Sequence, residues 1–189
     1  MPDAIRVSFL LTLSLMFMPL VAGAVMTEDQ LLFDVEPTLN QSFGASIAIG
    51  GYPEIGIWAV IGEPGDTVDE KAFAGSASMW AYARTTPEEG YWVNFGKLVA
   101  DSPVASARVG SPVAMSGDVV ALGAPSWGTD GYGAVYVYRY EPDSLFWEFE
   151  QRLTPTLNKT SQSNAGVVAL SGDVIVISAF YTNPAATFV

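Results

Sequence analysis

The chain has 189 residues, of which 50% are hydrophobic and 12% aromatic, and its 8 basic and 20 acidic residues give a formal net charge of −12. This apolar content excludes a disordered acidic chain, which lacks the apolar surface needed to offset the entropy of ordering. A surface this negative repels phosphate backbones and anionic lipids. We therefore expect no nucleic-acid partner and no membrane partner beyond the N-terminal segment. Cysteine and histidine are both absent, which excludes disulfides, zinc–thiolate sites and Ser–His–Asp catalysis.

The N-terminus has the features of an export signal. Arg6 and the terminal amine form a short basic flank, residues 7–20 are a largely apolar run, and residues 22–24 are small. This pattern predicts a signal peptide over residues 1–24 and a secreted or cell-surface protein. Two alternatives stay open at this stage. Residues 7–26 are long enough for an uncleaved membrane anchor, and the run could also be a buried strand or helix of the fold.

The rest of the chain contains internal repeats of β-type sequence. The segments "VGSPVAMSGDVVALGAP" (109–125) and "NAGVVALSGDVIVISAF" (164–180) align at their Ser-Gly-Asp turns, and "FGASIAIGG" (43–51) followed by "IWAVIGEP" (57–64) is a third copy. Pro-Thr-Leu-Asn precedes two of the copies, at 37–40 and 155–158. Because the connecting segments repeat together with the turns, whole structural units are repeated.

Each unit is predicted to contain four strands. In the second unit these span 111–115, 119–123, 133–140 and 145–153, and in the first unit 45–49, 57–61, 76–84 and 91–99. Apolar runs on both sides of a two-residue Gly-Asp turn are a strong hairpin signal. The pattern predicts an all-β fold of β-propeller-type four-stranded blades. A β-sandwich or meander is the alternative, and a β-solenoid fits less well because its rungs are shorter.

Three of these motifs have the pattern of a known repeat. At "FGASIAI", "VGSPVAMSGDVVALGAP" and "GAVYVYRY" the chain resembles the FG-GAP repeat of integrin-alpha-type propellers. Phe43-Gly44 matches the first element of that repeat and Gly123-Ala124-Pro125 the second, whereas Gly62-Glu63-Pro64 departs by one residue and the last copy keeps neither element. The resemblance covers roughly residues 28–180. It implies extracellular adhesion or ligand binding.

On this resemblance, residues 25–189 form an incomplete, open propeller of about two and a half blades. The blades are expected at about 43–100 and 109–154, with part of a third at 164–189, and residues 29–35 are expected to be an outer strand of a neighbouring blade. A propeller needs about four blades to close, so open edges and apolar faces would be exposed. We expect either a piece of a longer protein, which the end at Val189 within a unit favours, or self-association through open blade edges.

The acidic residues of the chain give one candidate cation site. Integrin-type blades bind Ca²⁺ in an Asp-rich hairpin loop, where six to eight oxygen ligands converge. The corresponding turns here, at 116–118 and 171–173, each offer a single carboxylate, so we expect no integrin-type calcium site and no cofactor. A weak candidate, which is otherwise a solvated acidic loop, follows the second strand of the first unit and consists of Glu63, Asp66, Asp69 and Glu70. Nothing in their spacing argues for a glycosidase acid/base pair.

Aromatic and asparagine side chains supply the other candidates. Trp127 and Tyr132 lie in a Gly-rich loop and could bind a sugar or a peptide. Asn40 and Asn158 fall at the same place in two units and are N-glycosylation acceptors in a secretory pathway that glycosylates.

Four glycines are interpreted as structural. Gly44 and Gly110 lie where the chain enters the innermost strand, where a side chain would crowd the neighbouring blade. Gly117 and Gly172 are expected to supply the positive φ of the hairpin turns. The functional hypothesis is a non-catalytic extracellular binding or adhesion module with an unknown protein or glycan ligand. The alternative is a secreted carbohydrate-binding or carbohydrate-active protein.

Overall fold

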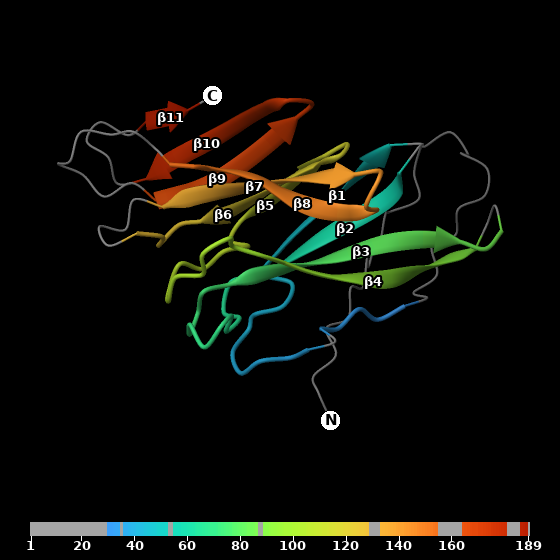
Figure 1. Cartoon of the computed structure of the whole chain (residues 1–189), viewed down its shortest axis with the longest axis horizontal. Coiled ribbons are helices and arrows are strands. Elements are labelled where there is room, and N and C mark those ends of the chain that lie inside the picture. Colours follow the sequence, from blue (N-terminus) through green and yellow to red (C-terminus); the bar gives the residue numbers. More distant parts are fainter. Residues whose placement is uncertain are drawn as a thin grey trace, which may run out of the picture.

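The computed structural model describes residues 30–34, 36–52, 55–86, 89–128, 133–154, 164–180 and 186–188. Its strands form three antiparallel sheets (Figure 1). The first sheet contains β1 (Ser46–Tyr52), β2 (Gly56–Glu63), β3 (Ser76–Arg84) and β4 (Gly90–Val99). The second contains β5 (Val113–Ser116), β6 (Val119–Ala124), β7 (Ala134–Glu141) and β8 (Phe146–Leu153). The third contains β9 (Asn164–Ser171), β10 (Val174–Phe180) and β11 (Ala186–Phe188).

The prediction of an all-β fold with four-stranded, propeller-like units is confirmed. Strands follow one another in chain order within each sheet, and none of the described sheets closes into a barrel. The third sheet has one strand more than the hairpin expected from the sequence, because β11 pairs with β10. The predicted signal peptide over residues 1–24 lies outside the described residues. Within the described ranges, no helix is long and apolar enough to span a membrane.

The three sheets stack face to face, and the second lies between the other two (Figure 1). The first strand of each sheet packs on the first strand of the next, β1 on β5 and β5 on β9. Between the first two sheets the core includes Trp58, Met79, Met115, Leu122 and Tyr136. Between the second and third it includes Ala114, Ala121, Val137, Val168 and Ile177. Strands β5 and β6 are buried on both faces because their side chains alternate between these two cores.

The chain enters the first two sheets through the same backbone arrangement. The amide of Gly44 donates to the carbonyl of Gly62 over 3.1 Å, and the amide of Gly110 donates to that of Gly123 over 3.0 Å. A Cβ on Gly110 would lie 2.2 Å from the carbonyl oxygen of Ser76 in the preceding sheet. Together with its φ of 88°, this contact explains why glycine occupies the position. Positive φ is also found at the other three glycines predicted to be structural, Gly44, Gly117 and Gly172.

The N-terminal segment differs from its prediction as an outer strand. Residues 30–34 belong to no strand. Instead the side-chain amide of Gln30 bonds both the backbone amide (2.6 Å) and the carbonyl (2.8 Å) of Trp92, at the free edge of β4. Leu32 and Phe43 then pack on the outer face of the first sheet, against Ile61 and other buried residues. The side-chain amide of Gln30 therefore makes, at Trp92 alone, the two hydrogen bonds that a paired strand would make there, and the segment continues across the face of the sheet.

Candidate functional site

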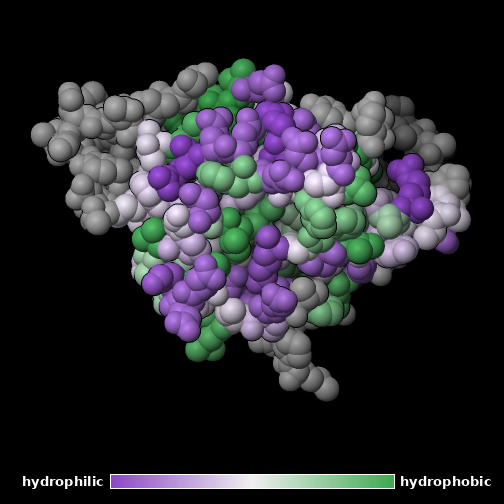
Figure 2. Space-filling model, in the orientation of Figure 1, coloured by the Kyte–Doolittle hydropathy of each residue, from purple (hydrophilic) through white to green (hydrophobic). Residues whose placement is uncertain are grey.

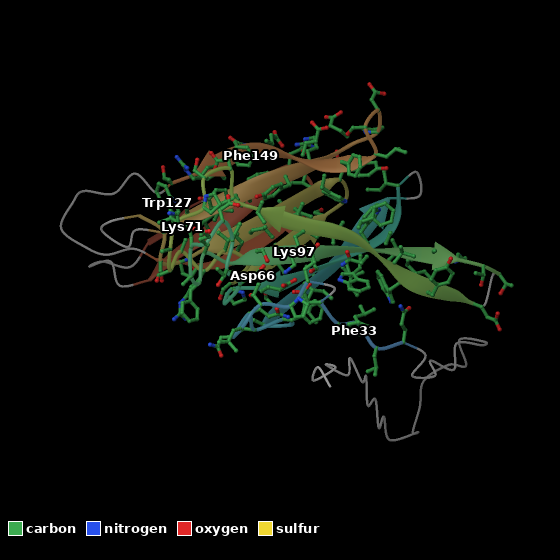
Figure 3. The ribbon with its side chains drawn as sticks, turned by 60° about the horizontal axis from the view of Figure 1, so that its bottom comes forward. Phe33, Asp66, Lys71, Lys97, Trp127 and Phe149 are labelled. Carbon is green, nitrogen blue, oxygen red and sulfur yellow. The ribbon has the colours of Figure 1, made fainter. Side chains whose placement is uncertain are left out.

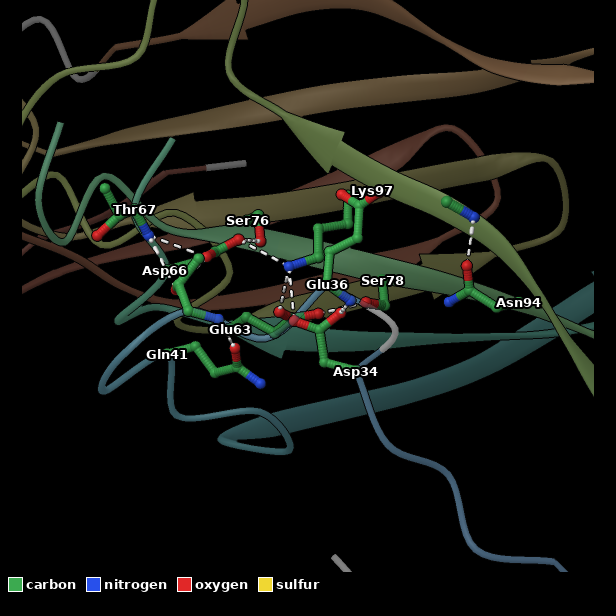
Figure 4. A network of polar contacts seen from close by, with 12 residues as sticks. Asp34, Glu36, Gln41, Glu63, Asp66, Thr67, Ser76, Ser78, Asn94 and Lys97 are labelled. Carbon is green, nitrogen blue, oxygen red and sulfur yellow. Dashed lines mark hydrogen bonds and ion pairs between the residues drawn. The ribbon is translucent and has the colours of Figure 1, made fainter. Parts of the chain in front are cut away.

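A cluster of charged side chains lies on the outer face of the first sheet, beneath the N-terminal segment (Figure 4). The register of the sheet assembles most of it. Glu63, the last residue of β2, pairs with Ser76 on β3, and Ser78 pairs with Lys97 on β4. Cross-strand partners and residues two apart on a strand share one face. Asp66 joins them from the turn after β2, and the N-terminal segment contributes Asp34.

Lys97 is at the centre of this cluster. Its Nζ lies 2.7 Å from Asp34 Oδ2, 2.9 Å from Asp66 Oδ2 and 3.0 Å from Glu63 Oε2. Three hydroxyl groups complete the network. Ser78 donates to Glu63 Oε1. Asp66 accepts from Ser76 over 2.7 Å and from Thr38 over 2.5 Å.

The cluster is almost fully removed from solvent. The side chains of Asp34 and Glu63 are 0% exposed, that of Asp66 3% and that of Lys97 14%. One ammonium group is therefore shared among three buried carboxylates, so the charges of the cluster do not cancel. Because almost no solvent reaches these groups, water does not stabilise the excess negative charge. The protonation states of the cluster therefore depend on burial and hydrogen bonding.

The buried environment shifts the pKa values of Glu63, Asp66 and Lys97 in different ways. Burial raises the pKa of Glu63 to about 7, although the hydrogen bonds from Ser78 and Lys97 act in the opposite direction. For Asp66 burial also acts upwards, but hydrogen bonds from Thr38, Ser76 and Lys97 outweigh it and lower its pKa. Burial alone would lower the pKa of Lys97, but its three carboxylate partners raise it above the usual range. Lys97 is therefore a permanent cation at physiological pH and is not available as a nucleophile or base.

Of the four predicted cation ligands, the structure brings two together. Glu63 and Asp66 converge, and the ammonium of Lys97 occupies the space between them. Asp69 and Glu70 do not join the cluster. They are exposed residues of a tight turn with φ of 48° and 62°. Within the described ranges, no group of three or more Asp and Glu side chains is arranged to hold a metal ion.

Sequence reasoning missed Lys97 and Asp34, although one signal pointed to them. Gly62-Glu63-Pro64 stands where the second unit has Gly123-Ala124-Pro125, and Ala124 is fully buried between the first two sheets. A carboxylate in the place of a buried alanine requires a cationic partner nearby, because an unpaired buried charge is too costly. Only the fold shows that Lys97, which is 34 residues further along the chain, is that partner.

The other predicted sites lie elsewhere on the molecule. Trp127 follows β6 and is partly buried against the core between the first two sheets (Figure 3). The guanidinium of Arg152 lies over its ring, 4.5 Å from the centroid, so one face of the indole is covered. Asn40 is exposed in the turn that precedes the first sheet. Tyr132 and Asn158 lie outside the described residues.

The family model described as FG-GAP repeat matches residues 92–138. The chain contains an FG-GAP repeat. The match begins in β4, crosses the connection to the second sheet and ends in β7. The matched segment therefore contains most of the last strand of the first sheet, and the first two strands and most of the third strand of the second sheet. It includes Gly110 and the Gly123-Ala124-Pro125 segment, which confirms the resemblance in this part of the chain. No curated protein matches the sequence.

Proposed function

We propose that this protein is an extracellular, non-catalytic binding or adhesion module. The observation that carries the proposal is the FG-GAP repeat over residues 92–138, set in a stack of three propeller-like sheets. An FG-GAP repeat suggests a β-propeller-like binding module. In such a scaffold the sheets are held rigidly by their shared cores, and the loops at the ends of the strands are free to vary and to contact a ligand.

The chemistry of the cluster around Lys97 supports a non-catalytic role. Glu63 and Lys97 have strongly raised pKa values and Asp66 has a lowered one, and perturbed pKa values are often a mark of an active site. Here these groups contact one another and are covered by the N-terminal segment, so a substrate has no direct access to them. Their arrangement fits a structural role, in which Asp34 and Thr38 hold the N-terminal segment against the first sheet.

The charge of the chain suggests the kind of surface that it binds. With a net charge of −12, the molecule attracts basic partners, does not repel neutral ones and repels acidic ones. Figure 2 shows hydrophilic and hydrophobic residues interspersed on the face of the molecule seen in Figure 1. A protein with a basic surface or an uncharged glycan fits this character better than an anionic polysaccharide does.

Expression of the full chain in a secreting host tests the proposal. We expect the protein in the medium, with residue 25 at the N-terminus of its mature form, and saturable binding to at least one neutral glycan or immobilised extracellular protein. Retention inside the cell, or hydrolysis of a glycan by the purified protein, would contradict it. Trp127→Ala separates the two binding alternatives. Loss of glycan binding in this variant but not in Tyr91→Ala, which removes an exposed aromatic of the first sheet, would favour the carbohydrate-binding alternative.

A further inference from the structure

The two ends of the stack present apolar surface that no described residue covers. On the outer face of the first sheet, Ile47 is 47% and Ile49 58% exposed. They share that face with Ala59 and Ile61, their partners on β2, which the N-terminal segment does cover. At the other end, Val174 of the third sheet is 53% exposed. It lies beside exposed Ala169 and half-buried Val176 on the face that points away from the second sheet.

The internal repeat shows what each of these faces normally contacts. Each sheet has a leading face, which in the second sheet packs on the first sheet and consists of Val113, Met115, Val120 and Leu122. In the third sheet the equivalent residues pack on the second sheet and are Val168, Leu170, Ile175 and Ile177. In the first sheet the equivalent residues are Ile47, Ile49, Ala59 and Ile61. The free face of the first sheet is therefore a leading face on which no sheet of the described residues packs.

The free face of the third sheet is the other half of the same interface. Each sheet also has a trailing face, which in the second sheet packs on the third and includes Ala114, Val119 and Ala121. The equivalent residues of the third sheet are Ala169, Val174 and Val176. Each first strand has an alanine at the same trailing position, namely Ala48, Ala114 and Ala169. In the first strands, large leading-face side chains thus pack against small trailing-face residues, as Met115 does where its Cγ would lie 2.9 Å from a Cβ on Gly50.

We infer that a second copy of this chain docks head to tail, with the trailing face of its third sheet on the leading face of the first sheet. The chain carries both halves of an interface that it already forms twice internally, so the partner with matching chemistry is the chain itself. A contact between two different faces is heterologous and propagates until it closes. Two copies would place six sheets in one ring, within the four to eight that propellers contain.

The N-terminal segment is compatible with this docking. Leu32 and Phe43 are the repeat equivalents of Leu98 and Val109, and these two residues lie in the core between the first and second sheets. The segment thus occupies the place that the end of β4 and its connection occupy between two docked sheets. It covers the outer part of the leading face and leaves open the part around Ile47 and Ile49, where first strands pack on first strands.

Charge sets the conditions for the association. Each copy carries a net charge of −12, so the copies repel one another at low ionic strength. The side chains of Ile47, Ile49, Ala169, Val174 and Val176, which would form the contact, are apolar. Because salt screens the repulsion without weakening apolar contact, association is expected to increase from low salt to about 0.5 M salt.

The test measures the mass of the purified full chain by analytical ultracentrifugation over a range of concentrations. We expect a monomer–dimer equilibrium, with the dissociation constant raised at least tenfold by Ile49→Asp or by Val174→Asp. Leu145→Asp is the matched control, because it adds the same charge at a residue that is 61% exposed in the turn between β7 and β8. It should change the constant less than twofold. Association that neither test variant weakens, for example through residues 1–24, would contradict the inference.

Mixing the two impaired variants distinguishes the head-to-tail arrangement from a symmetric one. Each variant alone has one damaged half in every interface, whereas the mixture has one undamaged interface between an Ile49→Asp copy and a Val174→Asp copy. We expect the mixture to form one-to-one dimers that neither variant forms alone. A chain that stays monomeric at all concentrations and salt conditions would overturn the inference. A mixture of the two variants that does not form dimers would also overturn it. The same holds for a longer form of the chain whose additional sheets cover these two faces.

Cross-linking keeps the inference testable if the aspartate variants fail to fold. The chain has no cysteine, so Ile49→Cys and Ala169→Cys place single thiols on the two faces. Oxidation of the mixture should give mainly the heterodimer joined at 49 and 169. A yield no higher than that obtained with Leu145→Cys in place of Ile49→Cys would contradict the proposed contact.

Discussion

Lys97 and Arg152 occupy equivalent positions in the first and second sheets. Lys97 pairs with Ser78 on β3, and Arg152 pairs with Tyr136 on β7. Lys97 Nζ lies 2.9 Å from Asp66 Oδ2, and the guanidinium of Arg152 lies 4.5 Å from the ring centroid of Trp127.

Their partners are equivalent as well, because Asp66 and Trp127 each stand four residues after the last glycine of the second strand, Gly62 and Gly123. The repeat thus places a cation of the fourth strand against the loop after the second strand. It does so with an ion pair in one sheet and a cation–π contact in the other. In the first sheet the cation lies in the buried ion cluster, whereas Arg152, which is 33% exposed, makes a separate ion pair with Asp101 over 3.7 Å.

Replacement of Lys97 tests the ion cluster. Lys97→Met leaves three carboxylates, of which two are fully buried, without their cation. We expect the free energy of unfolding at pH 7 to fall by about 3–5 kcal/mol, as when one partner of a buried ion pair is removed. Denaturant unfolding measures the change. Lys71→Met, at an exposed lysine, should change it by less than about 0.5 kcal/mol. Equal effects of the two variants would contradict the assigned role.

Stability should depend on the protonation of Glu63. Because burial raises its pKa from 4.5 to about 7, the folded state binds this proton more tightly than the unfolded state does. The free energy of unfolding should therefore fall as the pH rises from about 4.5 to about 7, by on the order of 3 kcal/mol from this group. The lowered pKa of Asp66 and the raised pKa of Lys97 act outside that window.

The Glu63→Gln variant isolates this contribution. The difference in unfolding free energy between wild type and Glu63→Gln should change across pH 4.5–7 and be flat above pH 7. Glu70→Gln, at an exposed carboxylate in the turn that follows the cluster, should show no such change. A wild-type profile that matches that of Glu63→Gln over the whole range would show that Glu63 does not titrate there.

The N-terminal segment should contribute to stability through Leu32. This side chain is 6% exposed and packs on the first sheet. Leu32→Ala should therefore cost about 2–3 kcal/mol and speed the proteolytic cleavage of residues 30–45. Leu39→Ala makes the same substitution at a side chain that is 86% exposed and should be nearly neutral. Equal cleavage rates in the two variants would indicate that the segment is not held by this contact.

The close approach at Gly110 can be separated from its backbone conformation. Gly110 and Gly56 have similar φ, 88° and 79°, but a Cβ would meet nothing within 4 Å at Gly56 and would lie 2.2 Å from Ser76 O at Gly110. Gly56→Ala should cost about 1–2 kcal/mol, the conformational penalty alone. Gly110→Ala should cost at least about 2 kcal/mol more, because the backbone of the neighbouring sheet must move. Thermal and denaturant unfolding measure both, and equal costs would argue against the contact.

The strands and turns could be predicted because their signals are local. The range 76–84 coincides with β3, and the Gly-Asp turns at 117–118 and 172–173 join β5 to β6 and β9 to β10. The N-terminal segment was predicted less well. The internal repeat aligns this segment with the end of an outer strand, and that alignment is visible in the sequence. The bonds from Gln30 to Trp92, however, join residues 62 apart in the chain, and no local pattern indicates them.

By itself, the sequence determined the all-β repeat, the hairpins and the FG-GAP glycines. These depend on the alternation of side chains and on backbone conformations that few residues adopt. Only the tertiary structure decided that Glu63 and Asp66 meet Lys97 rather than solvent, because strand register, and not spacing along the chain, brings them to one face. The stacking of the sheets also decided which two apolar faces remain uncovered in the described part of the chain, since each face of a repeated sheet is buried or free according to its neighbours.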